Sequence, residues 1–217
     1  MQIEMRDICK AFGANTVLNH ASFFMKSGEI HALMGENGAG KSTLMNILTG
    51  VHKKDSGIIL VDDREVCYRS PQEAEKGGIV FIHQELNVLY DLTVEENMFL
   101  GKELQKAPGI CDRKAMQRRA GEVLKGLGVE ISPQTRMCDL SVGQQQMVEI
   151  AKAFMVDAKA IIMDEPTAAL TQSETELLFQ VVKRLKKQGV SIIYISHRME
   201  EIFVLCDRVT VLRDGAY

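Results

Sequence analysis

Runs of apolar residues, separated by segments with helical periodicity, recur along most of the chain. Four runs are predominantly apolar, as is typical of strands buried in a parallel sheet that helices cover on both faces. They are Ile30–Met34, Ile79–Ile82, Ala160–Met163 and Val190–Ile195. A last strand is expected at Arg208–Arg213. Ser70 is expected to cap a short helix that begins at Pro71, and Thr171–Glu174 matches a capping box that opens another helix. The pattern predicts an α/β fold with a mostly parallel sheet.

The N-terminal part has a different pattern. Gln2–Ile8 and Thr16–Met25 mix apolar and polar residues at short period on either side of the turn at 13–15, which predicts an antiparallel hairpin. Phe12 lies at that turn. Its ring could stack on an adenine or belong to the core, and the pattern alone leaves both open. We expect an N-terminal antiparallel β subdomain.

Helical patterns dominate the middle of the chain. Apolar residues recur at helical spacing in Asp112–Leu127 and Gln144–Phe154, and a shorter helix is expected at Thr93–Leu100. We therefore expect one domain over residues 1–217, with residues 85–156 forming an inserted helical subdomain. Residues 1–84 and 157–217 would form the core with its antiparallel β subdomain.

One loop combines glycines with a lysine and a hydroxyl side chain. Gly35–Ser42 reads G-E-N-G-A-G-K-S, follows an apolar strand and leads into a helix. The glycines let backbone N–H groups turn inward, Lys41 reaches the outer phosphates, and Ser42 can ligate Mg²⁺. The loop predicts a nucleoside triphosphate site. Its residues are Gly35, Glu36, Asn37, Gly38, Ala39, Gly40, Lys41 and Ser42.

Two acids, Asp164 and Glu165, end the third apolar run. In P-loop proteins the first acid at such a strand end holds the Mg²⁺ that bridges the phosphates, which suits Asp164. Glu165 would point to the other side of the backbone and could polarise a water molecule. A solvated loop is the alternative, and the phosphate loop makes the functional interpretation stronger.

The sequence L-S-V-G-Q at Leu140–Gln144 directly precedes a helix. Ser141 and Gly143 at a helix N-terminus would form a second anion-binding surface. Taken alone, the motif is an ordinary N-capped helix. A second anion site makes sense if it serves the nucleotide of another subunit.

Composition and charge narrow the possible partners. The net charge of −3 provides no overall field for nucleic acid, and no nucleic-acid partner is expected. The five cysteines have no C-x-x-C spacing and an odd total, which indicates a reducing interior. No run of 18 apolar residues and no signal sequence is found, so the chain is expected to be neither secreted nor membrane-spanning by itself.

Taken in order, the motifs resemble those of an ATP-binding-cassette ATPase over essentially the whole chain. They are the phosphate loop, Gln84 after a strand, L-S-V-G-Q, I-I-M-D-E-P at Ile161–Pro166 and I-S-H at Ile195–His197. The wording of the last three is similar to the first cassette of bacterial monosaccharide importers of the ribose, galactose and xylose type. The resemblance implies ATP hydrolysis that drives sugar import at the cytoplasmic face of the bacterial inner membrane.

The resemblance also implies a role for each motif residue. Gly35–Thr43 would bind the phosphates, Phe12 would stack on adenine, and His197 would contact the γ-phosphate. Ser42 and Gln84 would be ligands of Mg²⁺, Asp164 would hold it through water, and Glu165 would be the general base. The signature residues Ser141, Val142, Gly143 and Gln144 would close on ATP bound by an opposing cassette.

Partners follow from the same resemblance. They are a second cassette, membrane permease subunits whose coupling helix would dock near Gln84–Val94, and indirectly an extracytoplasmic sugar-binding protein. Such importers carry two cassettes in one chain, so this one is expected to be the N-terminal half; its second cassette would be the missing C-terminal half or another copy of this half. The loop Thr167–Thr171 lacks the aspartate common in the wider superfamily, which leaves open whether the two sites communicate there.

Two other functions are alternatives. A soluble ATP-switched clamp acting on ribosomes or nucleic acid should carry a basic stripe or a long coiled-coil insertion, and neither is found in the sequence. A small-molecule kinase with a phosphate loop would not need the Ser141 signature.

Overall fold

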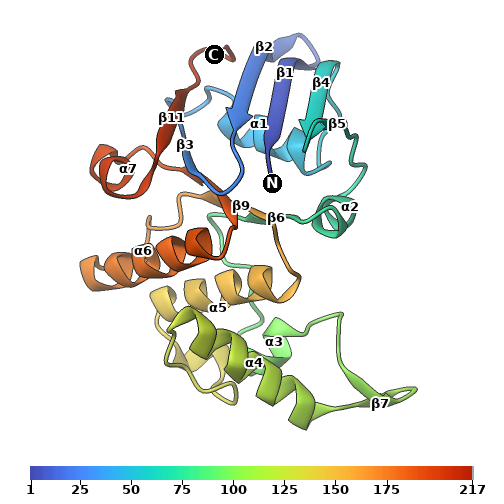
Figure 1. Cartoon of the computed structure of the whole chain (residues 1–217), viewed down its shortest axis with the longest axis vertical. Helices are drawn as coiled ribbons and strands as arrows, with labels where there is room; N and C mark the ends of the chain where they lie inside the picture. Colours follow the sequence, from blue (N-terminus) through green and yellow to red (C-terminus); the bar gives the residue numbers. More distant parts are fainter. Residues whose placement is uncertain (217) are drawn as a thin grey trace. The chain divides into compact units, whose positions relative to one another are not determined.

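The computed structural model describes residues 1–216, which form two compact units (Figure 1). The first unit contains Met1–Ile82, Ala158–Pro166 and the chain from Leu185 onward. The second contains His83–Asp157 and Thr167–Arg184. The segment 85–156, predicted to be a helical subdomain, lies within the second unit, and the structure groups Thr167–Arg184 with it.

A four-stranded antiparallel sheet contains the predicted N-terminal hairpin. Its spatial order is β2-β1-β4-β5. The strands are β1 (Ile3–Phe12), β2 (Asn15–Met25), β4 (Ser56–Val61) and β5 (Arg64–Glu65). Phe12 is the last residue of β1 and pairs with Asn15, so the turn is only two residues long. The hairpin prediction is confirmed, with strands longer than the sequence pattern indicated.

The second sheet of this unit has five parallel strands in the order β11-β3-β10-β9-β6. They are β3 (Ile30–Met34), β6 (Ile79–Ile82), β9 (Ala160–Asp164), β10 (Ser191–Ile195) and β11 (Arg208–Val211). Because the strands are parallel, the loops that follow β3, β9 and β10 start from the same edge of the sheet, where such sheets bind ligands.

The core of the first unit joins both sheets through α1 (Lys41–Leu48). Leu44, Met45 and Leu48 of this helix are fully buried and pack in one cluster with side chains of both sheets. This apolar face anchors the helix that begins directly after the phosphate loop. Two short helices complete the unit: α2 (Pro71–Lys76), capped by Ser70, and α7 (Met199–Leu205).

In the second unit, α3, α4 and α5 pack pairwise against one another. These helices are α3 (Val94–Met98), α4 (Arg113–Leu127) and α5 (Val142–Met155). Helix α6 (Gln172–Lys187) begins in this unit with the predicted capping contact, in which the Thr171 N–H donates to Glu174 Oε2 at 2.9 Å. A short 3₁₀ helix covers Met137–Asp139.

The sequence pattern did not predict the small hairpin of β7 (Gln105–Ala107) and β8 (Ile110–Cys111). All five of its residues are exposed, so no alternation of apolar and polar residues marks it. Within residues 1–216, no helix is long and apolar enough to cross a membrane. The five cysteines are free thiols.

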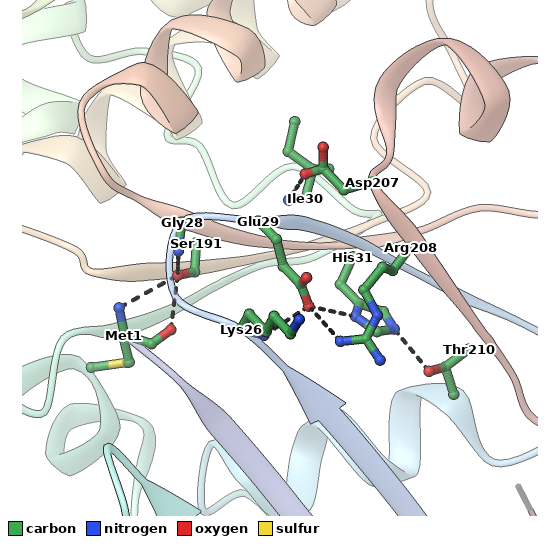
Figure 2. Close-up of polar contacts among 10 residues, drawn as sticks. All are labelled: Met1, Lys26, Gly28, Glu29, Ile30, His31, Ser191, Asp207, Arg208 and Thr210. Atoms are coloured by element: carbon green, nitrogen blue, oxygen red, sulfur yellow. Dashed lines mark hydrogen bonds and ion pairs between the residues drawn. The ribbon is translucent and has the colours of Figure 1, made fainter.

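A buried polar network fixes the start of β3 (Figure 2). His31 is fully buried, with its Nδ1 2.9 Å from Glu29 Oε1 and its Nε2 2.8 Å from the Thr210 hydroxyl oxygen. Glu29 also accepts the Lys26 backbone N–H at 2.7 Å and lies 3.4 Å from Arg208. The network ties the end of β2 and the first residues of β3 to β11, which sets the position of the strand that leads into the phosphate loop.

Candidate nucleotide-binding site

The loop between β3 and α1 has a backbone that only glycine tolerates at two of its positions. Gly40, the N-cap of α1, has φ 97°, and a Cβ there would lie 2.7 Å from Leu18 Cδ2. A Cβ on Gly35 would collide with the Leu212 carbonyl oxygen. These close approaches hold the loop at the N-terminus of α1, where the helix dipole and free backbone N–H groups favour an anion.

Lys41 folds back across this loop. Its Nζ donates to the Gly35 carbonyl at 2.9 Å and to the Glu36 carbonyl at 3.0 Å, and the residue is only 8% exposed. Over residues 1–216, no carboxylate forms an ion pair with this ammonium. The charge is therefore held inside the curve of the loop without an acidic partner, as a phosphate-binding lysine requires.

The other loop residues differ in exposure. Glu36, Asn37 and Gly38 form the exposed tip, Ala39 is buried, and Thr43 is half-buried in the first turn of α1. The tip therefore presents its backbone to solvent while both ends of the loop are packed.

Ser42 and Asp164 meet at the carboxyl edge of the parallel sheet. The Ser42 hydroxyl donates to Asp164 Oδ2 at 3.2 Å, joining the first residues of α1 to the last residue of β9. Hydroxyl and carboxylate oxygens are ligands that suit Mg²⁺. In the described part of the chain, no cluster of three or more His, Cys, Asp or Glu side chains could hold a metal ion. This pair therefore fits a Mg²⁺ that takes its remaining ligands from phosphate and water.

Glu165 has an unusual backbone for a residue of its type. Its φ is 44°, and its N–H donates to the Ile195 carbonyl at 2.9 Å. Its Oε1 lies 3.0 Å from His197 Nδ1, while Asp164 contacts Ser42. The two neighbouring acids thus have different partners, as expected for different roles. Left-handed conformations of non-glycine residues are costly and concentrate at functional sites.

Phe12 is 44% exposed, so it is not a core residue. Its ring makes an edge contact with His52 at 5.2 Å between centroids, and Lys10 Nζ lies 5.2 Å from its centroid. Lys10 is itself paired with Asp55 at 2.8 Å. The exposed ring with a cation beside it suits stacking on a nucleobase, one of the two alternatives that the sequence left open.

The signature segment begins α5. The Ser141 hydroxyl oxygen accepts the Gln144 N–H at 3.2 Å, and the Gln144 side chain accepts the Ser141 N–H at 3.0 Å, which is a complete capping box. Gly143 is buried, whereas Ser141 and Val142 are exposed. Ser141 and Gly143 therefore lie together at the N-terminus of α5, as predicted.

Gln84 is exposed and follows the end of β6 by two residues, in the second unit. Glu174 was predicted only as part of a helix cap, yet its Oε1 accepts the Ser141 hydroxyl hydrogen at 2.7 Å. The capping motif indicated the local contact with Thr171, but the Ser141 contact joins residues 33 positions apart, for which a single sequence has no signal.

Comparison with known proteins adds a family and close relatives. Residues 18–168 match the ABC transporter family. The ribose import ATP-binding protein RbsA of Bacillus licheniformis is 62% identical over 215 residues, covering 99% of this chain and 44% of that protein. The protein of the same name from Bacillus subtilis is 58% identical, with the same coverage of both chains. The chain thus spans less than half the length of these relatives.

Solved structures are similar over the whole chain. A nucleotide-free ATP-binding cassette from an ABC transporter is 28% identical with a TM-score of 0.86, over 100% of this chain and 89% of that one. A dimeric ATP-binding cassette bound to ADP and Pi is also 28% identical, with a TM-score of 0.81 over 99% and 95% of the two chains.

Proposed function

The chain belongs to the ABC transporter family, and from that membership we propose that it is an ATP-binding and ATP-hydrolysing cassette that energises monosaccharide import through separate permease subunits. The observation that carries the proposal is the arrangement at the sheet edge. The phosphate loop holds the Lys41 ammonium without a carboxylate partner among residues 1–216. The next residue, Ser42, contacts Asp164, the last residue of β9.

Each residue then has a physical task in binding. The backbone N–H groups of Gly35–Thr43 and the Lys41 ammonium would hold the phosphates, because both place positive charge at the N-terminus of α1. Phe12 would stack on the adenine. Ser42 and Asp164, with Gln84, would hold Mg²⁺, Asp164 through a water molecule. Bound Mg²⁺ bridges the phosphates and offsets their negative charge.

Two residues would act in hydrolysis. Glu165 would take a proton from the attacking water, since its carboxylate contacts His197 whereas that of Asp164 contacts Ser42. His197 would contact the γ-phosphate, where a donor matters chiefly as charge shifts in the transition state. The 3.0 Å contact also holds the Glu165 carboxylate in one orientation.

The signature would serve a different nucleotide. Ser141, Val142, Gly143 and Gln144 would close on ATP held by an opposing cassette, so turnover would require two cassettes face to face. The relatives are named as import ATP-binding proteins and are more than twice as long as this chain, which supports a second cassette in the same polypeptide. A copy of this half could substitute for it.

The remaining partners follow from the import role. We propose membrane permease subunits that dock near Gln84–Val94, and a ribose-like sugar delivered by an extracytoplasmic binding protein, with the cassette peripheral at the cytoplasmic face. The names of the relatives support ribose as the first sugar to test. Co-purification of the full-length protein with its membrane subunits, and ribose-dependent ATP turnover of that complex, should be observed. A complex that ignores every monosaccharide would contradict the import role.

The catalytic proposal is tested with Glu165→Gln. This change keeps the shape of the side chain and should preserve MgATP binding while lowering hydrolysis by about 10²–10⁴-fold, the usual span for losing a general base. Because ATP then persists, light scattering at high protein concentration should show a dimer with MgATP that is missing with MgADP.

Ser141→Arg in the Glu165→Gln background should remove that dimer, since it places bulk and charge at the γ-phosphate position. Ser132→Arg is the matched control, because Ser132 is an exposed serine of the same unit outside the signature. Full turnover in a demonstrably monomeric wild-type protein would contradict the composite site. The same holds if Ser141→Arg leaves both dimer and turnover intact.

A further inference from the structure

The proposed anion-binding surface of the signature, at Ser141 and Gly143, is in contact with the carboxylate of Glu174. Glu174 Oε1 accepts the Ser141 hydroxyl hydrogen at 2.7 Å, and its Oε2 accepts the backbone N–H and the hydroxyl of Thr171, both at 2.9 Å. A Cβ on Gly143 would lie 2.5 Å from Glu174 Oε1. The carboxylate therefore lies at the start of α5 and also caps α6, so two helix N-termini converge on it.

The surroundings keep this carboxyl group ionised. Hydrogen bonds from the Thr171 N–H, the Ser141 hydroxyl and the Thr171 hydroxyl hold the pKa of Glu174 below its usual value. At neutral pH the side chain is an anion, and one of its donors, the Ser141 hydroxyl, is a group that the proposed γ-phosphate would use. No lysine or arginine forms an ion pair with it within residues 1–216.

Ser141 cannot serve two acceptors at once. Its hydroxyl has one hydrogen, which it donates to Glu174, while its oxygen accepts the Gln144 N–H at 3.2 Å. A γ-phosphate approaching from an opposing cassette would need that hydrogen and the Gly143 N–H. The phosphate and the Glu174 carboxylate would also repel each other at contact distance.

We propose that Glu174 is an internal competitor for the signature, which the γ-phosphate of an opposing ATP must displace before two cassettes close. This inference rests on the proposed function, because it assumes that the signature receives that phosphate. It assigns to Glu174 a specificity role: weak or incomplete ligands such as ADP cannot displace the carboxylate, whereas the γ-phosphate brings enough charge to do so.

The helix cap alone does not explain the arrangement. A capping box on α6 needs the contact between Thr171 and Glu174, and Oε2 alone provides it. Oε1 is directed to a hydroxyl 33 residues away along the chain. The absence of a side chain at Gly143 is what leaves room for the carboxylate at this position, since any Cβ would meet Glu174.

The test uses Glu174→Gln in the Glu165→Gln background. Glutamine also completes a capping box, so α6 should keep its cap while the negative charge is lost. A charge-assisted hydrogen bond is about twice as strong as a neutral one, so glutamine should compete less well than glutamate for Ser141. The dissociation constant of the MgATP-dependent dimer should therefore fall about five- to tenfold. Sedimentation equilibrium with MgATP and with MgADP measures the dimer dissociation constant.

Glu176→Gln is the matched control. Glu176 lies on the same helix and is exposed, and its one side-chain hydrogen bond among residues 1–216 is from Gln172 at 3.3 Å, so the same change of charge should leave the dimer unaffected. A thermal unfolding scan of each variant checks that α6 is intact. Glu174→Ala, which also lacks the cap, should likewise lower the dissociation constant of the dimer.

The outcomes separate the inference from the function on which it rests. If Glu165→Gln dimerises with MgATP but Glu174→Gln leaves the dissociation constant unchanged or raises it, Glu174 is not a competitor and the composite site stands. If Glu176→Gln has the same effect as Glu174→Gln, the cause is general charge and the inference is wrong. If no variant dimerises with MgATP, the composite site itself fails, and the inference fails with it.

Discussion

His197 Nδ1 lies 3.0 Å from Glu165 Oε1. His197 comes two residues after the end of β10, and Glu165 directly follows β9. The strands β9 and β10 are neighbours in the parallel sheet, and Ile195 pairs with Asp164 at their ends. The contact is therefore a direct product of strand order. The orientation of Glu165, the proposed base, therefore depends on His197. Mutation of His197 would remove both this contact and the proposed contact with the γ-phosphate.

His197→Ala should retain MgATP binding within about twofold while lowering turnover by about 10²-fold or more, the range for one transition-state donor. Equilibrium nucleotide binding and single-turnover hydrolysis separate the two effects. The control is His20→Asn at an exposed position, where asparagine tolerates the φ of 53°. Normal turnover in His197→Ala would leave the contact with a structural role only.

Lys41→Ala should abolish tight MgATP binding, because it removes the one cation held inside the phosphate loop. The fold should survive, because within residues 1–216 the ammonium donates only to the carbonyls of Gly35 and Glu36 in that loop. Calorimetric titration with MgATP and a thermal scan measure the two quantities. The matched control is Lys53→Ala, an exposed lysine after α1. An affinity unchanged within about twofold would remove Lys41 from the site.

Phe12→Ala should weaken ATP binding by about 1–3 kcal/mol if the ring stacks on adenine, and Phe12→Tyr should be nearly neutral. Because the side chain is 44% exposed, the unfolding midpoint without nucleotide should hardly change. Competition between ATP and GTP provides a second measurement, since loss of stacking affects both bases. A lowered midpoint with unchanged affinity would assign Phe12 to packing.

The sequence was sufficient where the physical signal is local. The strands β3, β6, β9 and β10 are predominantly apolar because both faces of the sheet are covered. The phosphate loop, the Ser70 cap and the Thr171 cap were all found because each motif lies within eight residues or fewer. The hairpin at β7 and β8 has no buried residue and left no periodicity to detect.

Contacts between distant segments were beyond a single sequence. Ser141 and Glu174 are 33 residues apart, and His31 and Thr210 are 179 apart. Their pairing depends on which strands and helices become neighbours, and that order is fixed by packing. The family resemblance placed Asp164, Glu165 and His197 in one site, but only the structure shows that Glu165 contacts His197 while Asp164 contacts Ser42.

Buried His31 should make the stability of the protein depend on pH. Burial lowers the pKa of His31 below its usual value of 6.5, and Arg208 adds to the effect, while Glu29 opposes it. The folded protein therefore keeps the imidazole neutral at pH values where the unfolded chain binds a proton. Stability should be constant above the unfolded pKa and should fall as the pH drops below it toward the folded pKa.

His31→Gln removes this titration and can keep one hydrogen bond to Thr210. The variant should be less stable than the wild type at pH 7.5, and the difference in unfolding free energy should shrink between pH 6.5 and 5.5. The limit is about 1.4 kcal/mol per pH unit for one proton. Urea unfolding at several pH values measures the difference directly, and other titrating groups cancel because both proteins contain them. A difference that grows on acidification would mean that Glu29 outweighs burial and raises the pKa of folded His31, and a constant difference would mean that the two effects cancel; either result contradicts the prediction.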